Sequence, residues 1–156
     1  MNKIFFLVAF SIICFSKELT FGIVPQQSPL KLSKKWINIT DYLTKETGIN
    51  IIFKTESSIP KFEKKLYSSA YDISYMNPFH FVVAREKQNY KAFIRAKKNI
   101  VGILVSKTKK NNLSFEYLKE KIFLFPAPNA FAATILPKNE LKDKFGLLYV
   151  PHLYLE

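Results

Sequence analysis

The chain has 156 residues, enough for one domain, or for one full lobe and part of another. Hydrophobic residues make up 48% of the sequence and aromatic residues 15%, a composition that excludes disorder over most of its length. The formal net charge of +12 favours anionic partners, namely nucleic acid, membrane headgroups or acidic solutes.

The N-terminus has the features of a signal peptide. Lys3 supplies a positive charge, and a run of about a dozen apolar residues follows it, too short to span a bilayer comfortably. Cys14 and Ser16 form a small-x-small cleavage site, which assigns residues 1–16 to the signal and predicts export. A lipoprotein signal with Cys14 lipidated is the less favoured alternative, because Ile13 is bulkier than the residue usual at that place. Cleavage would leave a mature chain without cysteine, and therefore without disulfides.

Strands and helices are expected to alternate through the first half of the mature chain. Strands are predicted at residues 18–24, 49–54 and 71–76, and helices at 33–47, 58–66 and 77–86. A loop is expected over residues 25–29. Gly48 is expected to end the first helix, and Asn77 and Pro78 are expected to start the third, as its cap and its first residue.

The second half is predicted to continue with shorter elements. Runs at 90–95, 100–105 and 122–126 are expected to be strands, and 107–112 a turn. Short helical pieces are expected from Ser114 to Lys119 and over 139–144, the latter ended by Gly146. The stretch FPAPNAFAAT at 125–134 is interpreted as a strand end, a tight turn and the bare start of a helix. Strands separated by helices predict an α/β fold with a mostly parallel sheet.

Side chains for catalysis or metal binding are scarce. His80 and His152 have no neighbour at ligand spacing, no phosphate-binding glycine motif is present, and no pair of carboxylates stands out. His80 is interpreted as an ordinary packed or surface histidine rather than a site contact, and Asp72 as a structural carboxylate. Arg, the usual specific reader of bases and phosphates, occurs only at Arg85 and Arg95, so most of the positive charge is assigned to a solvated lysine surface. We therefore expect no enzyme, no cofactor, no metal and no nucleic-acid partner.

Two helix starts remain as candidate anion sites. Residues 75–78 and 125–129 both place an Asn beside a Pro between a strand and a helix. Free backbone N–H groups and the helix dipole favour an anion at such a start. After Asn129 the small side chain of Ala130 leaves the first turn open, and Phe131 could form an apolar wall. Spacing alone supports an anion site and a plain N-cap equally.

Several segments carry a family resemblance. YDISYMNPFHFVVA, GILVSK and FPAPNAFAATIL resemble the phosphate/phosphite/phosphonate-type periplasmic substrate-binding proteins of ABC transporters. LTFGIVPQQSP and SIPKFEKKL resemble the opening strand and second helix of that family, so the resemblance runs from about Glu18 to Gly146. It implies a type II periplasmic-binding fold, in which two α/β lobes close on a small oxyanion and deliver it to an ABC permease or a membrane sensor. It also implies a monomer in the periplasm that performs no reaction.

The resemblance further implies a division of the chain and a set of ligand contacts. Lobe one would span 17–99, a crossover strand 100–106, a partial lobe two 107–146 and a divergent tail 147–156. The implied ligand-binding residues are Pro25, Gln26, Gln27, Tyr75, Asn77, Asn129, Ala130 and Phe131.

Two departures from the family pattern shape the expectations. In phosphonate binders, the hydroxyl groups of a Ser/Thr-rich segment bind the phosphonyl oxygens. Residues 128–132 here are Pro-Asn-Ala-Phe-Ala and have no hydroxyl group. The ligand is therefore expected among phosphate, phosphite, phosphonate or a more apolar anion. Complete receptors of this type are also about twice as long, which predicts a truncated second lobe with exposed strand edges. The alternatives are an exported cationic protein that binds acidic polymer or membrane surface, and a non-functional receptor fragment.

Overall fold

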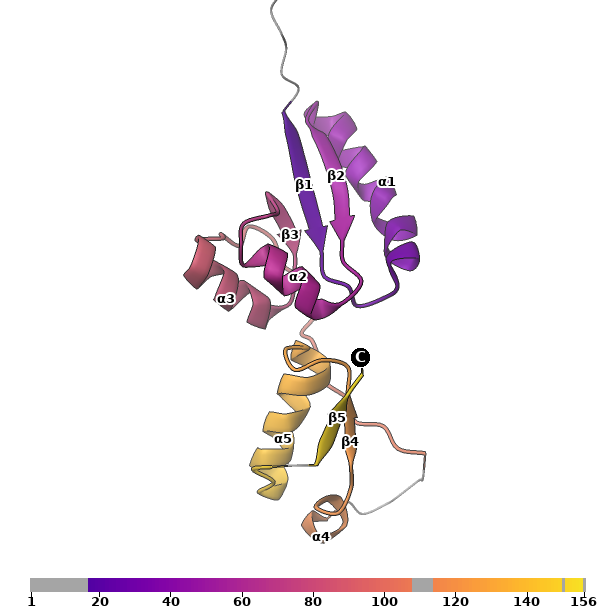
Figure 1. Cartoon of the computed structure of the whole chain (residues 1–156), viewed down its shortest axis with the longest axis vertical. Helices are drawn as coiled ribbons and strands as arrows, with labels where there is room; N and C mark the ends of the chain where they lie inside the picture. Colours follow the sequence, from indigo (N-terminus) through magenta and orange to yellow (C-terminus); the bar gives the residue numbers. More distant parts are fainter. Residues whose placement is uncertain (1–16, 108–113, 150, 156) are drawn as a thin grey trace, which may run out of the picture.

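The structure is a computed structural model, and it describes residues 17–107, 114–149 and 151–155. The residues predicted as a signal peptide, and most of the turn predicted at 107–112, lie outside the described residues. The elements form two lobes, each with its own sheet (Figure 1). Lobe one comprises β1 (Glu18–Ile23), α1 (Pro29–Thr47), β2 (Asn50–Thr55), α2 (Ile59–Leu66), β3 (Ile73–Tyr75) and α3 (Pro78–Gln88). Lobe two comprises α4 (Phe115–Leu118), β4 (Phe123–Phe125), the π-helix η1 (Phe131–Ile135), α5 (Leu136–Phe145) and β5 (His152–Tyr154).

The sheet of lobe one is parallel, with the strand order β2-β1-β3. Phe21 at its centre pairs with Phe53 on one side and Ile73 on the other. Parallel neighbours need a crossover connection, and α1 and α2 provide the helices between successive strands. The expected α/β fold with parallel strands is therefore confirmed.

A hydrophobic cluster between the sheet, α2 and α3 holds lobe one together. Phe62 and Leu66, which the helical spacing placed on one face of α2, are fully buried. The Phe62 ring stacks on Tyr71 at 5.5 Å between centroids, and Val24 and Ala84 complete the cluster. Full burial of each large side chain contributes roughly 1.5–3 kcal/mol.

Most helix ends lie where the sequence indicated. Asn77 caps α3 through its side chain, and Gly48 adopts the left-handed conformation at the end of α1, with φ +68°. Ser114 caps α4 by accepting a hydrogen bond from the Tyr117 N–H at 3.3 Å. Helix α1 begins at Pro29, four residues before the predicted start at residue 33. A proline at the first helical position has no N–H to lose, so Pro29 belongs to the helix rather than to the loop.

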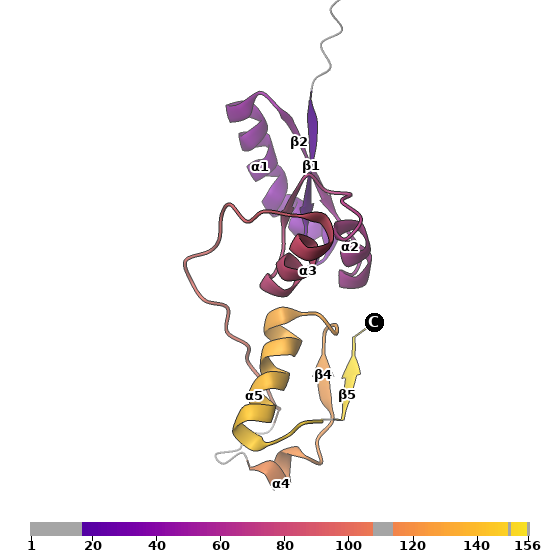
Figure 2. The same ribbon diagram turned by 90° about the vertical axis from the view of Figure 1, so that its left-hand side faces the viewer.

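The strands predicted at 90–95 and 100–105 are wrong. Neither run forms a strand, although both contain the aromatic or β-branched residues that favour strands. A strand exists through its hydrogen-bonded partner, and no described strand pairs with either run. The segment instead runs as an extended strap between the lobes (Figure 2), and Val105 is 91% exposed. Gly102 lies against lobe two, where an added Cβ would collide with the Ala132 carbonyl oxygen and lie 3.1 Å from Pro137 Cδ.

Lobe two is a two-stranded parallel sheet with α5 packed on one face. Phe123, Leu124 and Phe125 of β4 pair with His152, Leu153 and Tyr154 of β5. Leu118, Phe125, Leu141 and Leu147 form the buried cluster. Strand β5 lies within the tail, for which the sequence predicted no element.

The helix of lobe two differs from the prediction. One helical run extends from Phe131 to Phe145, beginning with the π-turn η1, where the sequence indicated a bare helix start and a separate piece at 139–144. Ala130, not Asn129, is the residue before the first turn, and no side chain caps it. Of the two alternatives kept for Asn129, the plain N-cap is therefore wrong, because the turn that ends β4 continues one residue further.

Candidate functional site

The starts of α3 and η1 lie at the junction between the lobes. The carboxyl ends of the strands of both sheets point toward this junction (Figure 1). Asn77 Nδ2 donates a hydrogen bond to the Asn129 carbonyl oxygen at 3.2 Å. Two of the residues predicted to bind ligand, 52 positions apart in the chain, are therefore in direct contact.

Both the oxygen and the nitrogen of the Asn77 amide have a hydrogen-bond partner in this arrangement. Asn77 is only 6% exposed, and its Oδ1 accepts a hydrogen bond from the His80 N–H at 2.8 Å, which is the N-cap bond of α3. Its Nδ2 faces the Asn129 carbonyl. An N–H on one side and a carbonyl on the other fix which amide atom is oxygen and which is nitrogen.

His80 lies in the core directly behind Asn77. Its side chain is completely buried, and its Nε2 is 2.9 Å from Glu63 Oε1 of α2. A carboxylate only accepts hydrogen bonds, so Nε2 carries the hydrogen. The Nδ1 atom is buried with no hydrogen-bond partner among the described residues. The sequence left His80 as a packed or surface histidine, and no local signal indicated its bond to Glu63, which lies 17 positions away in the chain.

The turn before η1 is tied to the helix that follows it. The Thr134 hydroxyl donates a hydrogen bond to the Ala127 carbonyl at 2.7 Å, and the Ala130 N–H donates to the same oxygen at 3.2 Å. Thr134 is buried, and the sequence analysis did not single it out. The first turn of a helix has N–H groups without intrahelical acceptors, and here they begin at Phe131. π-turns of this kind occur frequently at functional sites.

The other predicted residues lie at the carboxyl end of the first sheet. Tyr75 is 48% exposed at the end of β3, and its ring is 5.0 Å from that of Trp36 on α1. The Tyr75 carbonyl accepts a hydrogen bond from the Val24 N–H at 3.0 Å, which brings the ends of β3 and β1 together just before Pro25. No hydrogen bond between described residues joins the loop at Pro25–Gln27 to lobe two.

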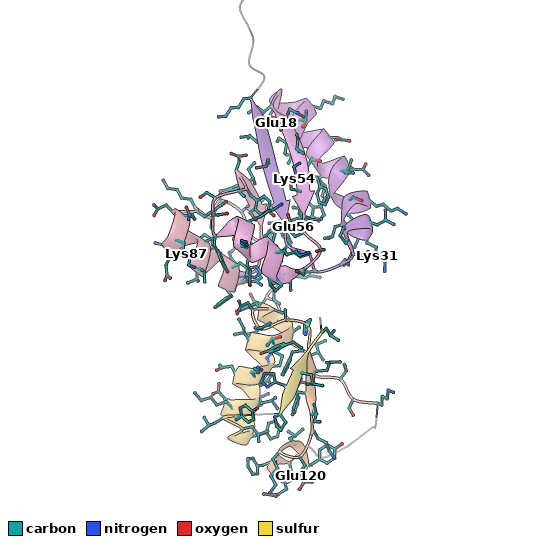
Figure 3. The ribbon with its side chains drawn as sticks, in the orientation of Figure 1. Glu18, Lys31, Lys54, Glu56, Lys87 and Glu120 are labelled. Carbon is teal, nitrogen blue, oxygen red and sulfur yellow. The ribbon has the colours of Figure 1, made fainter. Side chains whose placement is uncertain are left out.

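An open hollow of about 640 Å³ adjoins this loop at the start of α1. It is lined by Gln26, Gln27, Ser28, Lys31, Lys34 and Lys35. Figure 3 labels Lys31 at the end of α1 that is nearer lobe two. Gln26 and Gln27 were predicted site residues; the three lysines were not, although their spacing of three and four residues along one helix face could have indicated them.

The electrostatics of this hollow favour an anion. The first turn of α1 contains no acidic residue, and no ion pair between described residues involves Lys31, Lys34 or Lys35. The described partner of Lys35 Nζ is the neutral Gln27 Oε1 at 3.1 Å. Three ammonium groups at the positive end of a helix dipole repel one another, and an anion relieves that repulsion.

Asp72 lies away from this end of the sheet. Its carboxylate accepts hydrogen bonds from the Thr20 N–H at 2.8 Å and from the Thr20 hydroxyl at 2.7 Å. These bonds lower the pKa of Asp72 from its ordinary value. The carboxylate ties β1 to the start of β3, in agreement with its interpretation as a structural group.

Residues 17–107, 114–149 and 151–155 contain no cluster of three or more His, Cys, Asp or Glu side chains that could hold a metal ion. No helix within those same ranges is long and apolar enough to cross a membrane.

Comparisons with known proteins agree with this architecture. The structure is similar to a crystal structure of a binding protein component of an ABC phosphonate transporter from Pseudomonas aeruginosa, with a TM-score of 0.65 and 15% sequence identity. The match covers 89% of this chain but 50% of the other, so the chain spans about half the length of that protein. At this identity the similarity establishes the fold alone. No curated protein matches the sequence.

The family is established by the sequence itself. The model described as "ABC transporter, phosphonate, periplasmic substrate-binding protein" matches residues 21–150. This range includes both helix starts at the junction and nearly all of the described elements. The chain therefore belongs to the family of periplasmic substrate-binding proteins of phosphonate ABC transporters, which are binding components and not enzymes.

Proposed function

We propose that the protein captures a small phosphate-like oxyanion (phosphate, phosphite or phosphonate) at the junction between its lobes and delivers it to an ABC permease. The observation that carries the proposal is the meeting of two helix starts, linked by the 3.2 Å bond from Asn77 to the Asn129 carbonyl. Backbone N–H groups at such starts bind oxyanions without a basic side chain.

The charge distribution around the junction supports an anionic ligand. The lysine-lined hollow at the start of α1 lies at the same end of lobe one as the candidate contacts Gln26, Gln27 and Tyr75. Positive clefts raise the local concentration of anions and increase association rates. Lys31, Lys34 and Lys35 would thus attract the solute, while the helix starts bind it.

The contacts in lobe two favour a particular kind of oxyanion. Ala130 and Phe131 carry no hydroxyl group, the free backbone N–H groups begin at Phe131, and Phe131 adds a half-buried aromatic side chain. Such a surface suits an anion with a hydrogen atom or small apolar group on phosphorus, as in phosphite or methylphosphonate. Sulfate, which lacks that group, should bind more weakly.

Export is part of the proposal. The positive start and apolar run of residues 1–16 would direct the chain across the membrane, where the family acts. The binding cycle needs no cofactor, and the solute-loaded protein would act as a monomer. Its membrane partner would be a permease, or a sensor that reads the loaded state.

Thermal unfolding of the full chain with millimolar oxyanions tests this function. Phosphate, phosphite, methylphosphonate and sulfate are compared with glycerol as a neutral control. A ligand at about one hundred times its Kd adds roughly 2.7 kcal/mol, which raises the midpoint by several degrees. We expect phosphite or methylphosphonate to raise it most; an unchanged midpoint with every oxyanion would refute the proposal.

A charge-matched pair of variants locates the site. Asn129→Asp places a negative charge at the start of η1 and should abolish the shift. Asn99→Asp makes the same change in the exposed strap and should leave the shift intact. If the two variants respond alike, or if poly-L-glutamate stabilises the protein as much as the small ions do, the ligand does not bind at the junction.

A further inference from the structure

We infer that Asn77 is a latch between the lobes, and that His80 and Glu63 are positioning residues that aim its amide at lobe two. The inference deepens the proposed function, because a capture protein needs a defined contact where its lobes meet. It is carried by a series of buried and half-buried polar contacts that runs from Glu63 on α2, through His80 and Asn77, to the Asn129 carbonyl.

A single side chain performs two tasks in this chain. Asn77 Oδ1 belongs to lobe one, because it caps α3 by accepting from the His80 N–H at 2.8 Å. Asn77 Nδ2 belongs to the junction, because it donates to the Asn129 carbonyl at 3.2 Å. A flipped amide would set N–H against N–H and oxygen against oxygen, so the cap bond also fixes the direction of the latch.

His80 and Glu63 restrict that direction further. The His80 ring is fully buried, packed 5.7 Å from Phe62 between ring centroids, and anchored by Glu63 at 2.9 Å. Its Nε2 hydrogen is used by the carboxylate, so Nε2 cannot accept from Asn77 Nδ2, which lies 3.4 Å away. The Asn129 carbonyl is thus the acceptor that remains for the amide.

The two tasks of Asn77 can be separated by substitution. Asp and Ser are preferred N-cap residues, so Asn77→Asp and Asn77→Ser keep an oxygen acceptor for the His80 N–H. Neither provides the amide donor, and Asp places a carboxylate near the Asn129 carbonyl. Both variants should preserve α3 while releasing the lobes from each other.

The readout is the distance between the lobes, measured by pulsed electron spin resonance in the full chain. Nitroxide labels at Lys45→Cys on α1 and Lys142→Cys on α5 report it, in a Cys14→Ser background and without added oxyanion. We expect one narrow distribution with Asn77, and broad distributions reaching longer distances with Asp or Ser. Superimposable distributions for all three proteins would overturn the latch.

Three further variants test the positioning role. Glu63→Gln retains an oxygen acceptor for Nε2–H and should keep the narrow distribution, whereas Glu63→Leu leaves Nε2 free to accept from the Asn77 amide and should broaden it. His80→Phe removes that competing acceptor and keeps the backbone N–H that Asn77 caps, so it should keep the narrow distribution by itself and restore it in a Glu63→Leu background. A narrow distribution with Glu63→Leu, or a broad one that His80→Phe does not reverse, would refute the role of His80 and Glu63.

These measurements are independent of the proposed ligand. The distance distributions are recorded without oxyanion, so a protein that binds no phosphate-like ion can still show the latch. Repeating them with millimolar methylphosphonate tests the proposed function separately, through a further narrowing that Asn129→Asp should abolish. Loss of either result therefore identifies which of the two inferences has failed.

Discussion

The hydroxyl of Thr134 offers a sharp test of how the turn before η1 is held in place. Thr134 is 1% exposed, and its Oγ1 donates to the Ala127 carbonyl at 2.7 Å. Replacing it by Val keeps the shape of the side chain and removes the donor. The Ala127 oxygen retains the Ala130 N–H at 3.2 Å, so it is not left without a partner. The free energy of unfolding should therefore fall by the net contribution of one hydrogen bond, about 1 kcal/mol, rather than by the larger cost of burying an unpaired polar group.

Loss of this hydrogen bond in Thr134→Val should lower both the stability of the protein and its affinity for the ligand. A loss of about 1 kcal/mol lowers the unfolding midpoint by roughly 3 °C for a chain of this size. The N–H groups that begin at Phe131 lose the tether that orients them, so affinity for methylphosphonate should fall about fivefold if the whole loss reaches the site.

Thr134→Ser is the matched control for this prediction. It keeps the hydroxyl and removes a methyl group, which costs about 0.8 kcal/mol of stability, but it should leave the affinity nearly unchanged. Denaturant unfolding and isothermal titration with methylphosphonate measure the two quantities in all three proteins. Equal affinities of the Val variant and the parent, or an equal loss with Ser, would refute the reasoning.

Three further predictions follow from the fold and its charges. Gly102→Ala should destabilise the protein by about 1–3 kcal/mol in denaturant unfolding, because the new methyl group meets the Ala132 carbonyl; the neighbouring Val101→Ala, at an exposed position, should change stability by less than about 0.5 kcal/mol. Replacing Lys31, Lys34 and Lys35 together by Gln should slow oxyanion association and weaken its dependence on salt in stopped-flow measurements. The same change at the exposed Lys45, Lys91 and Lys142 should not, and equal effects of the two sets would show that only net charge matters. The pKa of Asp72 is lowered in the folded protein. Its carboxylate therefore stabilises the fold at pH values above its unfolded pKa of about 3.9, and this stabilisation is lost as the pH falls through the lower folded pKa. Asp72→Asn should therefore reduce stability at neutral pH and flatten the acid limb of the stability profile, and parallel profiles for the two proteins would contradict this assignment.

Local signals predicted much of lobe one. The cap Asn77 and the glycine that ends α1 act within a few residues of chain, so their structural effect can be predicted from the sequence alone. The spacing of Phe62 and Leu66, four residues apart, places both on one face of α2, and that face is the buried one. The order of alternating strands and helices was then enough to predict a parallel sheet.

The remaining features depend on partners distant in sequence. Residues 100–105 have strand composition, but no described strand pairs with them. Strand β5 forms because it pairs with β4, and its own three residues are too few to predict a strand from the sequence. The bond from Asn77 to Asn129 joins residues that sequence reasoning had selected separately for their helix starts. Their contact, and the aim that His80 gives to it, could be established only from the structure.

The strap between the lobes has a consequence for the solubility of the chain. Every residue from 100 to 105 other than Gly102 is Ile, Val or Leu, and the segment contains neither a charge nor a proline. No described strand pairs with it. Short windows of this kind stack between molecules into cross-β aggregates. Lys97, Lys98 and Lys107 flank the window on both sides, where charged gatekeepers oppose such stacking. The lysines around the strap thus protect solubility, a role distinct from anion capture, and neutralising them should lead to insoluble protein even where the fold itself is unharmed.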